Sequence, residues 1–363
     1  MNLKPFHERR LASLRAAIRG VHGLLVSNIV NVRYLTGFTG SSGYVLVTGK
    51  NALFITDPRY GKDALGDSAD LFETVIIRTG LDRAVRDLCR KLGVKKLGFE
   101  TTASYGFYER LKKTGVELRP LGGVVEPLRA VKDGYELECI KGAVKRAEEA
   151  FREIRPVIRA GAREQAVARR LEEKMTRKGS QGLPFPAIVA SGPNSAIPHA
   201  RPTERKMAPG DLVVIDWGAE FDGYCSDMTR TLLIKGGRGA DVTKKKKIYE
   251  TVLKAQQKAI AFIGASGGKD AKNIDNSARY VIKQADYGEY FTHGLGHGVG
   301  LEVHELPGIS SRSAWKRPVS DGMVITIEPG IYVPGVGGVR IEDMVFIEKG
   351  RPVVLTGLPR QLF

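Results

Sequence analysis

Cysteine is scarce in this sequence. The 363 residues include three cysteines, Cys89, Cys139 and Cys225, which lie far apart along the chain. An odd number of scattered cysteines does not form a disulfide framework, and none of them has the close spacing of a thiolate zinc site. We therefore expect all three to be buried and to pack as small hydrophobic side chains.

Long apolar runs are also missing. Residues 1–20 interrupt every apolar stretch with Arg, Lys or Glu, which excludes both the apolar core of a secretory signal and a membrane span of roughly 20 residues. Hydrophobic residues make up 42% of the chain and charged residues 27%, a balance typical of a globular protein in water. The expectation is a cytoplasmic protein with no membrane contact.

Acidic residues are outnumbered, with 40 Asp and Glu against 57 Lys and Arg and a formal net charge of +17. Such an excess would suit a nucleic-acid-binding protein if the cations gathered on one element. Here they are spread along the chain, and the densest run, Lys244–Lys247, opens a segment with helical spacing of its apolar residues. We interpret the excess as a solvated basic surface and do not expect nucleic acid as a partner.

The length and the pattern of the chain predict an α/β protein of two domains. Helical periodicity over 8–20 is followed by the short β-rich runs GLLVSN, GYVLVT and ALFITD. A Gly pair and a Pro in LGGVVEPLRAVKDGYELE precede a new helix. We place the boundary there, with domains at 1–128 and 129–363, and expect long helices over about 134–160 and 163–178 in the second.

The segment DLVVIDWGAEFDGYCSDMTRTLLI predicts a hairpin that turns at Asp222-Gly223. Pairing 221 with 224 and continuing outward pairs Asp216 with Thr229, which places Asp227 on the same face, diagonal to Asp216. Two carboxylates side by side on an apolar hairpin raise each other's pKa or attract a cation. The alternative is a pair of solvated aspartates at the strand edge.

Histidines are few but concentrated. Three of the six, His293, His297 and His304, lie in FTHGLGHGVGLEVHE, among glycines that permit close backbone approach and just before Glu305. Neutral imidazole is the commonest protein metal ligand. The glycine spacing does not match a phosphate-binding G-x-G-x-x-G loop, and no P-loop lysine follows. The cluster therefore predicts a site rather than a core histidine.

A second acidic pair lies in apolar surroundings near the end of the chain. The segment GMVITIEPGIYVPGVGGVRIEDMVFIE predicts two antiparallel strands, which carry Glu328 and Glu342. Carboxylates are rarely unpaired in such runs. Four carboxylates and one imidazole form a hard donor set suited to two divalent ions, whereas structural zinc would require thiolates.

These motifs resemble those of the pita-bread metallopeptidases, the group that contains aminopeptidase P, prolidase and methionine aminopeptidase. The resemblance rests on IDWGAEFDGYCSDMTRT, HGLGHGVGLEVHE, ITIEPGIY and GGVRIED, in the family's order, and GFTGSSGYVLVT resembles the amino-terminal domain of the proline-directed members. It implies a creatinase-type amino-terminal domain, a pita-bread (α+β) catalytic domain and a homodimer. It also implies five metal ligands: Asp216, Asp227, His297, Glu328 and Glu342.

The resemblance implies roles for neighbouring residues as well. His199 in AIPHARPT and its companion His304 would meet the substrate carbonyl or the leaving side. His293 would line the pocket, and Arg340 would orient ligand carboxylates, the alternative for Arg340 being an ordinary strand-surface arginine. Glu328 would pass a proton from the attacking water to the departing nitrogen.

The implied activity is removal of the amino-terminal residue from Xaa-Pro peptides, with manganese or cobalt as the metal and zinc or iron as alternatives. Dipeptidases of the group tend to carry an arginine four residues after the histidine of the VHE motif, where this chain has Gly308. We therefore favour aminopeptidase P-like action on longer proline-containing peptides over a prolidase, although Arg312 or Arg317 could reach the dipeptide carboxylate instead.

Two further alternatives stay open. One is a creatinase-like amidinohydrolase, which shares the fold but lacks the metal ligands, so the full ligand set argues against it. The other is a catalytically silent pita-bread module that binds nucleic acid or a protein partner. Such modules have typically lost ligands, whereas none of the five is missing here.

Overall fold

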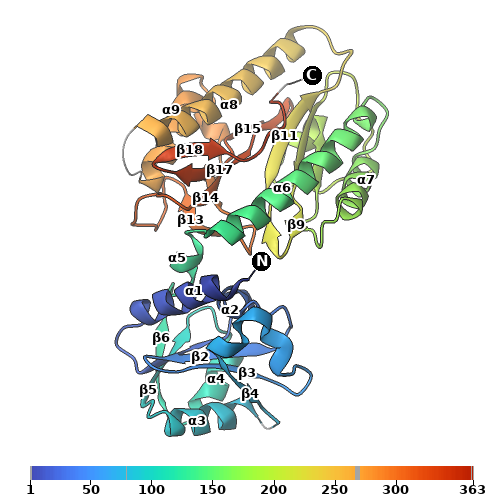
Figure 1. Cartoon of the computed structure of the whole chain (residues 1–363). Coiled ribbons are helices and arrows are strands. Elements are labelled where there is room, and N and C mark those ends of the chain that lie inside the picture. Colours follow the sequence, from blue (N-terminus) through green and yellow to red (C-terminus); the bar gives the residue numbers. More distant parts are fainter. Residues whose placement is uncertain (1, 79, 266–269, 361, 363) are drawn as a thin grey trace. The chain divides into compact units, whose positions relative to one another are not determined.

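A computed structural model describes residues 2–78, 80–265, 270–360 and 362. The chain forms two compact units, Met1–Arg129 and Ala130–Phe363, each with its own sheets and helices (Figure 1). Among the described residues, every helix is too short or too polar to cross a membrane. All three cysteines are free and buried, as expected.

The first unit is built around a mixed six-stranded sheet in the order β4-β3-β2-β1-β5-β6. Strand β2 runs antiparallel to β1 and β3, and β4, β5 and β6 each join parallel to a neighbour. The strands are β1 Gly23–Val26, β2 Gly43–Thr48, β3 Ala52–Thr56, β4 Glu73–Ile76, β5 Lys96–Glu100 and β6 Glu117–Leu121. The predicted runs GLLVSN, GYVLVT and ALFITD are thus confirmed as strands.

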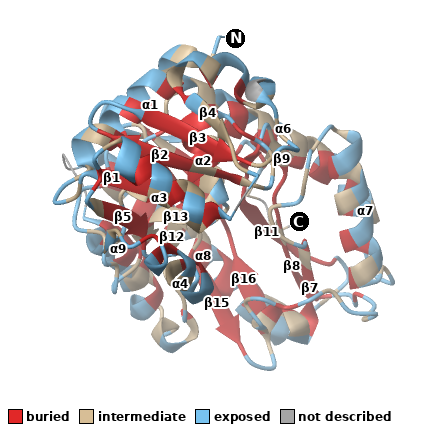
Figure 2. Ribbon diagram, turned by 90° about the horizontal axis from the view of Figure 1, so that it is seen from below, coloured by how far each residue is buried: buried red, intermediate tan, exposed pale blue. Residues whose placement is uncertain are grey.

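Helices cover both faces of this sheet. They are α1 Lys4–Ala17, α2 Ile29–Thr36, α3 Leu81–Lys91, α4 Tyr105–Lys112 and the short α5 Glu126–Arg129, with a 3-10 segment η1 Lys62–Leu71. Every position of β1 and β3 is buried, which is expected when both faces of a strand are covered. Figure 2 shows these strands as a buried layer between more exposed helices.

Helix α1 begins and ends earlier than the periodicity over 8–20 predicted. Pro5 occupies the first turn, where its missing N–H is not needed and its fixed φ suits a helix. The helix ends at Ala17, because Ile18 is extended and Gly20 takes a positive φ of 71°.

The second unit packs two helix pairs against antiparallel strands. Helix α6 (Gly134–Ile154) packs with α7 (Glu164–Arg177), and α8 (Ala240–Ala265) packs with α9 (Ala271–Gln284). The first pair shares a hydrophobic core with the sheet β11-β8-β7, and the second shares one with the sheet β13-β12-β14-β17-β18. The strands therefore lie between the two helix pairs (Figure 1).

The strands of this unit are short. They are β7 Ile188–Ser191, β8 Leu212–Trp217, β9 Glu220–Phe221, β10 Tyr224–Cys225, β11 Met228–Leu233, β12 Gly296–Gly298, β13 Glu305–Ile309, β14 Val324–Ile327, β15 Gly330–Val333, β16 Gly337–Arg340, β17 Asp343–Glu348 and β18 Arg351–Val354. The 3-10 segments are η2 Arg155–Val157, η3 Gly192–Ala196 and η4 Gly288–Tyr290.

Helix α6 starts at the predicted position but ends at Ile154 rather than near residue 160. Asp133 and Glu136 form a reciprocal capping box at its start. Pro156, inside η2, cannot donate the next helical hydrogen bond, and the chain leaves the helix there. The expected helix at 163–178 is confirmed as α7.

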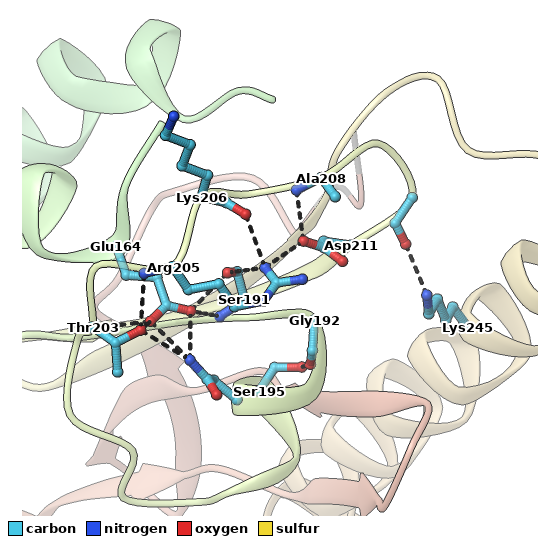
Figure 3. A network of polar contacts seen from close by, with 12 residues as sticks. Glu164, Ser191, Gly192, Ser195, Thr203, Arg205, Lys206, Ala208, Asp211 and Lys245 are labelled. Atoms are coloured by element: carbon cyan, nitrogen blue, oxygen red, sulfur yellow. Dashed lines mark hydrogen bonds and ion pairs between the residues drawn. The ribbon is translucent and has the colours of Figure 1, made fainter. Parts of the chain in front are cut away.

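One lysine of the Lys244–Lys247 run is not solvated as expected. Lys245 is 7% exposed. Its Nζ donates to the Gly210 carbonyl at 2.9 Å (Figure 3) and to Asp241 at 2.6 Å. Part of the basic run therefore holds α8 against the loop before β8.

The predicted hairpin and its register are confirmed. Phe221 pairs with Tyr224, and Asp216 pairs with Thr229. Asp222 and Gly223 have φ values of 50° and 78°, as a two-residue turn with positive φ at both positions requires.

The carboxy-terminal hairpin differs from the two continuous strands that were predicted. Its strands break at Glu328 and Glu342, so that β14 pairs with β17 and β15 pairs with β16. The cause is a change of hydrogen-bond partner, because Glu328 N donates to the Leu295 carbonyl and Glu342 N to the Thr229 carbonyl. The register continues across the break and places Glu328 opposite Glu342.

The core between α6 and β8 yields a stability prediction. The ring of Phe151 stacks on the fully buried Trp217, with 4.5 Å between centroids, and the indole donates to the Ala147 carbonyl. Phe151→Ala should lower the free energy of unfolding of the second unit by about 3–5 kcal/mol, because it leaves a cavity. Urea unfolding followed by tryptophan fluorescence reports on this unit alone, since the chain's two tryptophans, Trp217 and Trp315, both lie in it.

The matched control is Tyr280→Ala on α9, where the side chain is 63% exposed and the expected change is within about 0.5 kcal/mol. Equal losses in the two variants would contradict the assignment of Phe151 to the core.

Candidate metal centre

The five predicted ligands line one cavity. It has a volume of about 460 Å³, and its acidic and imidazole side chains come from several segments between residues 199 and 342. They are Asp216 on β8, Asp227 before β11, His297 on β12, Glu328 after β14 and Glu342 before β17, together with His199, His293 and His304.

The two hairpins meet at a bridge between Thr229 and Glu342. The backbone of Glu342 donates to the Thr229 carbonyl at 3.1 Å, and the Thr229 hydroxyl donates to Glu342 Oε2 at 2.7 Å. Asp216 lies opposite Thr229, and Glu328 lies opposite Glu342. One bridge therefore gathers the carboxylates of both hairpins.

His297 reaches this cluster from a glycine-flanked strand. A Cβ at Gly296 would collide with the backbone of Thr326 in β14, and one at Gly298 would collide with the backbone of Leu306 in β13. Only glycine at these two positions therefore allows β12 to lie this close to both neighbouring strands. His297 Nδ1 is 3.1 Å from the Gly298 carbonyl; a carbonyl can only accept, so Nδ1 carries the hydrogen. Nε2 faces Glu328 Oε1 at 3.3 Å and Asp227 Oδ2 at 3.6 Å.

Burial, and after it the repulsion between neighbouring carboxylates, determines the electrostatics of the cluster. Burial and the neighbouring carboxylates raise the pKa values of Asp227 and Glu342 well above their usual range. Burial also raises the pKa of Asp216, against the opposing effect of Arg340. Ionising all three carboxyls at once is therefore unfavourable, and a bound cation would offset the repulsion between their negative charges.

Glu328 and His297 shift each other in the opposite sense. Burial alone would raise the pKa of Glu328, but the hydrogen bond and charge of His297 outweigh it and lower that pKa. Burial would likewise lower the pKa of His297, but Glu328 raises it. Glu328 is therefore an ionised carboxylate at neutral pH.

The donor set fits a divalent cation. Asp227, His297 and Glu342 each offer a ligand atom, and these atoms lie within 4.8 Å of one another. Asp216 Oδ1 is buried without a hydrogen-bond partner among the described residues, although a buried carboxylate oxygen normally has one. A metal ion would satisfy that oxygen, and the oxygen-rich set suits hard or borderline ions.

Arg340 is buried, at 3% exposure, and is not a strand-surface arginine. Its guanidinium donates to Asp216 Oδ2 at 2.6 Å, to the Pro198 carbonyl at 3.1 Å and to the Tyr332 hydroxyl at 2.7 Å. Arg340 thus orients one predicted ligand and holds the segment that carries His199.

The three other histidines occupy different parts of the cavity wall. His293 Nδ1 donates to the Gly294 carbonyl, so its Nε2 accepts from the Tyr332 hydroxyl at 3.0 Å. The ring of His304 lies 4.3 Å from that of His297, whereas His199 is exposed at the cavity. Burial lowers the pKa values of His293 and His304, and the charge of His297 lowers that of His304 further. Both are therefore neutral at pH 7.

Sequence reasoning missed Glu164, which anchors the His199 loop through contacts that include Ser191 and Thr203 (Figure 3). This fully buried carboxylate accepts from the backbone and hydroxyl of Ser191, from the Asn194 amide, and from the backbone and hydroxyl of Thr203. It thus ties the end of β7 to both sides of His199. Nothing in the local sequence distinguishes Glu164 from an ordinary acidic residue in the first turn of a helix.

Lys132 was missed as well. Its Nζ lies 3.2 Å from Glu305 Oε2, with side chains 0% and 4% exposed, and Glu305 Oε1 accepts from the backbone of Glu302. This buried ion pair closes the turn that carries His304. The two partners are 173 positions apart, and Lys132 lies in a stretch that reads as a linker.

Known proteins are similar to this chain in both of its units. The sequence model of metallopeptidase family M24 matches residues 138–349, and that of the creatinase/prolidase N-terminal domain matches residues 10–131. A Xaa-Pro dipeptidase of Pyrococcus horikoshii is 38% identical over 348 residues, which cover 94% of this chain and 94% of that protein.

Solved structures are similar over nearly the whole chain. A Xaa-Pro dipeptidase from Bacillus anthracis has a TM-score of 0.92 at 39% identity and covers 98% of this chain and 99% of its own. An X-Pro aminopeptidase from Thermotoga maritima has a TM-score of 0.83 at 35% identity, with the same coverage of 98% and 99%.

The repulsion among the carboxylates predicts that Asp227→Asn stabilises the metal-free protein at neutral pH but weakens metal binding. Because the folded-state pKa of Asp227 is raised, the parent loses stability as pH rises above the ordinary carboxyl range of about 4, so the advantage of the variant should grow with pH. Thermal unfolding in chelator should shift by about 2–4 °C for each kcal/mol of relieved repulsion.

Asp343→Asn is the matched control. Asp343 pairs with Arg230 and Arg360, which hold its pKa below the usual range against the effect of burial. This variant should lose stability with or without metal, since it leaves Arg230 buried and unpaired. A metal-free Asp227→Asn protein less stable than the parent would contradict the repulsion argument.

For the His199 loop, Glu164→Gln should lower the free energy of unfolding by about 1–3 kcal/mol, because one buried donor would face the new amide instead of an acceptor. It should also speed tryptic cleavage after Arg205 and Lys206, which follow Thr203 in the released segment. Limited proteolysis measures the cleavage rate. The exposed Glu173→Gln on the same helix should leave that rate unchanged, and equal rates in all three proteins would show that Glu164 does not hold the loop.

Proposed function

The chain belongs to metallopeptidase family M24, and from this premise we propose that it removes the amino-terminal residue from Xaa-Pro peptides with the help of two divalent ions. The expected architecture, a creatinase-type domain followed by a pita-bread catalytic domain, is confirmed by the family matches. The observation that carries the proposal is the convergence of four carboxylates and four histidines on one cavity.

The metal ligands that we propose are Asp216, Asp227, His297, Glu328 and Glu342. The grouped ligand atoms of Asp227, His297 and Glu342 support one ion, and the unpartnered Oδ1 of Asp216 supports a second beside it. Bound divalent cations would supply Lewis acidity and lower the pKa of an attacking water. Manganese or cobalt is the proposed metal, with zinc or iron as alternatives.

Proton transfer is assigned to Glu328. Its pKa is lowered by His297 in spite of burial, so the carboxylate can accept the proton of the attacking water and deliver it to the departing nitrogen. The nitrogen of proline is tertiary and must be protonated to leave. Glu328 lies opposite Glu342, which supports a base close to the proposed ligands.

The tetrahedral oxyanion would receive hydrogen bonds from His304 and His199. The lowered pKa of His304, caused by partial burial and by His297, leaves a neutral ring whose N–H can donate. The segment that carries His199 is held by Arg340 at Pro198. Both side chains line the cavity beside the proposed metals.

Within this activity, we propose dipeptides as the preferred substrates. Similar proteins from Pyrococcus horikoshii, Pyrococcus furiosus and Bacillus anthracis bear the name Xaa-Pro dipeptidase or prolidase, which favours this choice over the aminopeptidase P-like activity suggested by Gly308. The Thermotoga maritima protein, named an X-Pro aminopeptidase, keeps that alternative open. The full donor set argues against the silent module and the amidinohydrolase, and the homodimer remains a proposal from the resemblance.

The direct test has two parts. Metal content is measured in protein purified without added metal, and hydrolysis of Xaa-Pro peptides of two to five residues is then assayed after manganese, cobalt or zinc is restored. We expect bound divalent metal and release of the first residue only. Protein that binds metal but cleaves none of these peptides would overturn the proposal.

The roles of the histidines predict that His304→Ala retains metal while its turnover falls about 100- to 1000-fold, the loss usual for one oxyanion donor. Glu342→Gln provides the contrast, because it should lose both turnover and metal. Elemental analysis beside kcat measurement separates the two cases. A fall in metal content in His304→Ala would make His304 a ligand.

A further inference from the structure

The wall of the metal cavity carries two guanidinium groups, those of Arg201 and Arg340. Arg340 is buried, and its donors are taken by Asp216, Tyr332 and Pro198. Arg201 is exposed and forms no hydrogen bond or ion pair with any residue that the structure describes. Its donors are therefore available to a substrate in the cavity.

The backbone at Arg201 is fixed on both sides. Arg340 holds the Pro198 carbonyl, and Glu164 holds the backbone and hydroxyl of Thr203. Ala200 is 7% exposed, and the prolines at 198 and 202 restrict φ further. The charge is thus borne by a flexible side chain on an anchored segment that lines the same cavity as His199.

An Xaa-Pro dipeptide brings a free carboxylate within one residue of the bond to be cut. A carboxylate that leaves water for the cavity needs a cationic hydrogen-bond donor to receive it. The sequence pointed to Gly308, Arg312 and Arg317 for this contact, but none of these three lines the cavity. The wall of the same cavity also includes Phe185, Pro186 and Ile188, apolar side chains that suit a pyrrolidine ring.

We propose that Arg201 determines specificity by binding the free carboxylate of the carboxy-terminal proline, so that dipeptides are preferred over longer peptides. The planar guanidinium can make two parallel hydrogen bonds to a carboxylate. An amide or a following residue at that position offers neither the charge nor the paired acceptors. This inference rests on the proposed function and names a residue for its substrate preference.

The test compares Ala-Pro, its carboxamide Ala-Pro-NH2 and the tripeptide Ala-Pro-Ala on the metal-loaded enzyme. In the parent, kcat/KM for Ala-Pro should exceed that for the amide about 10- to 100-fold, the range for a hydrogen bond to a charged group. Arg201→Met should remove this preference by lowering kcat/KM for Ala-Pro while that for the amide stays close to the parent value. Arg201→Lys, which keeps the charge but not the paired geometry, should fall between them.

Arg317→Met is the matched control and should keep the parental preference. The inference is overturned if Arg201→Met still prefers the free acid, if the preference is lost in Arg317→Met instead, or if the parent cuts Ala-Pro-NH2 as well as Ala-Pro. Calorimetric binding of Ala-Pro and its amide to the metal-loaded protein separates this inference from the proposed function. If no peptide is cut, the proposed function fails. In that case a parent that binds Ala-Pro more tightly than its amide, together with an Arg201→Met variant that does not, would still support the contact. Equal affinities of parent and variant for Ala-Pro would refute it.

Discussion

The bridge between Thr229 and Glu342 is the contact on which the metal centre depends. It joins two hairpins whose residues are 113 positions apart. The Thr229 hydroxyl donates to the Glu342 carboxylate and accepts from Arg340. Because each hairpin has a fixed register, this one contact also sets the positions of Asp216 and Glu328. A shift of either strand by one residue would turn a carboxylate into the core.

The fold holds these carboxylates together against their own repulsion. The apolar packing of α6 and α8 on the strands supplies the favourable free energy. Arg340 pairs directly with Asp216, and its charge offsets only part of the rise in the pKa values of Asp227 and Glu342. The raised pKa values of Asp227 and Glu342 are the result. Binding of a cation stabilises the folded state of such a site, so metal binding and folding are coupled.

Much of this architecture could be predicted from the sequence, because its signals are local. The Asp222-Gly223 turn determined the register that pairs Asp216 with Thr229, and acidic residues in apolar runs marked Glu328 and Glu342. The breaks in the carboxy-terminal strands could not be predicted, since they depend on hydrogen bonds to Leu295 and Thr229 in other segments.

Two residues of the site could not be predicted for the same reason, dependence on partners that are distant in sequence. Glu164 and Lys132 act through partners that are distant in sequence, and a buried anion satisfied by neutral donors leaves no local pattern. Arg201 lies in a short segment without helix or strand periodicity, so the sequence does not indicate where its side chain lies, and the structure shows that it lines the cavity.

The neutral donors around Glu164 make the position of the His199 loop insensitive to salt. Charge pairs in contact with solvent weaken as salt is added, since the Debye length is about 10 Å at 0.1 M ionic strength. The Glu164 carboxylate is buried, and its partners are hydroxyl, amide and backbone groups. Ionic strength should therefore change the position of the loop very little. Salt would act instead on the exposed guanidinium of Arg201, so that, if Arg201 binds the substrate carboxylate as proposed, a change in ionic strength would alter the choice between peptides more than the position of the loop.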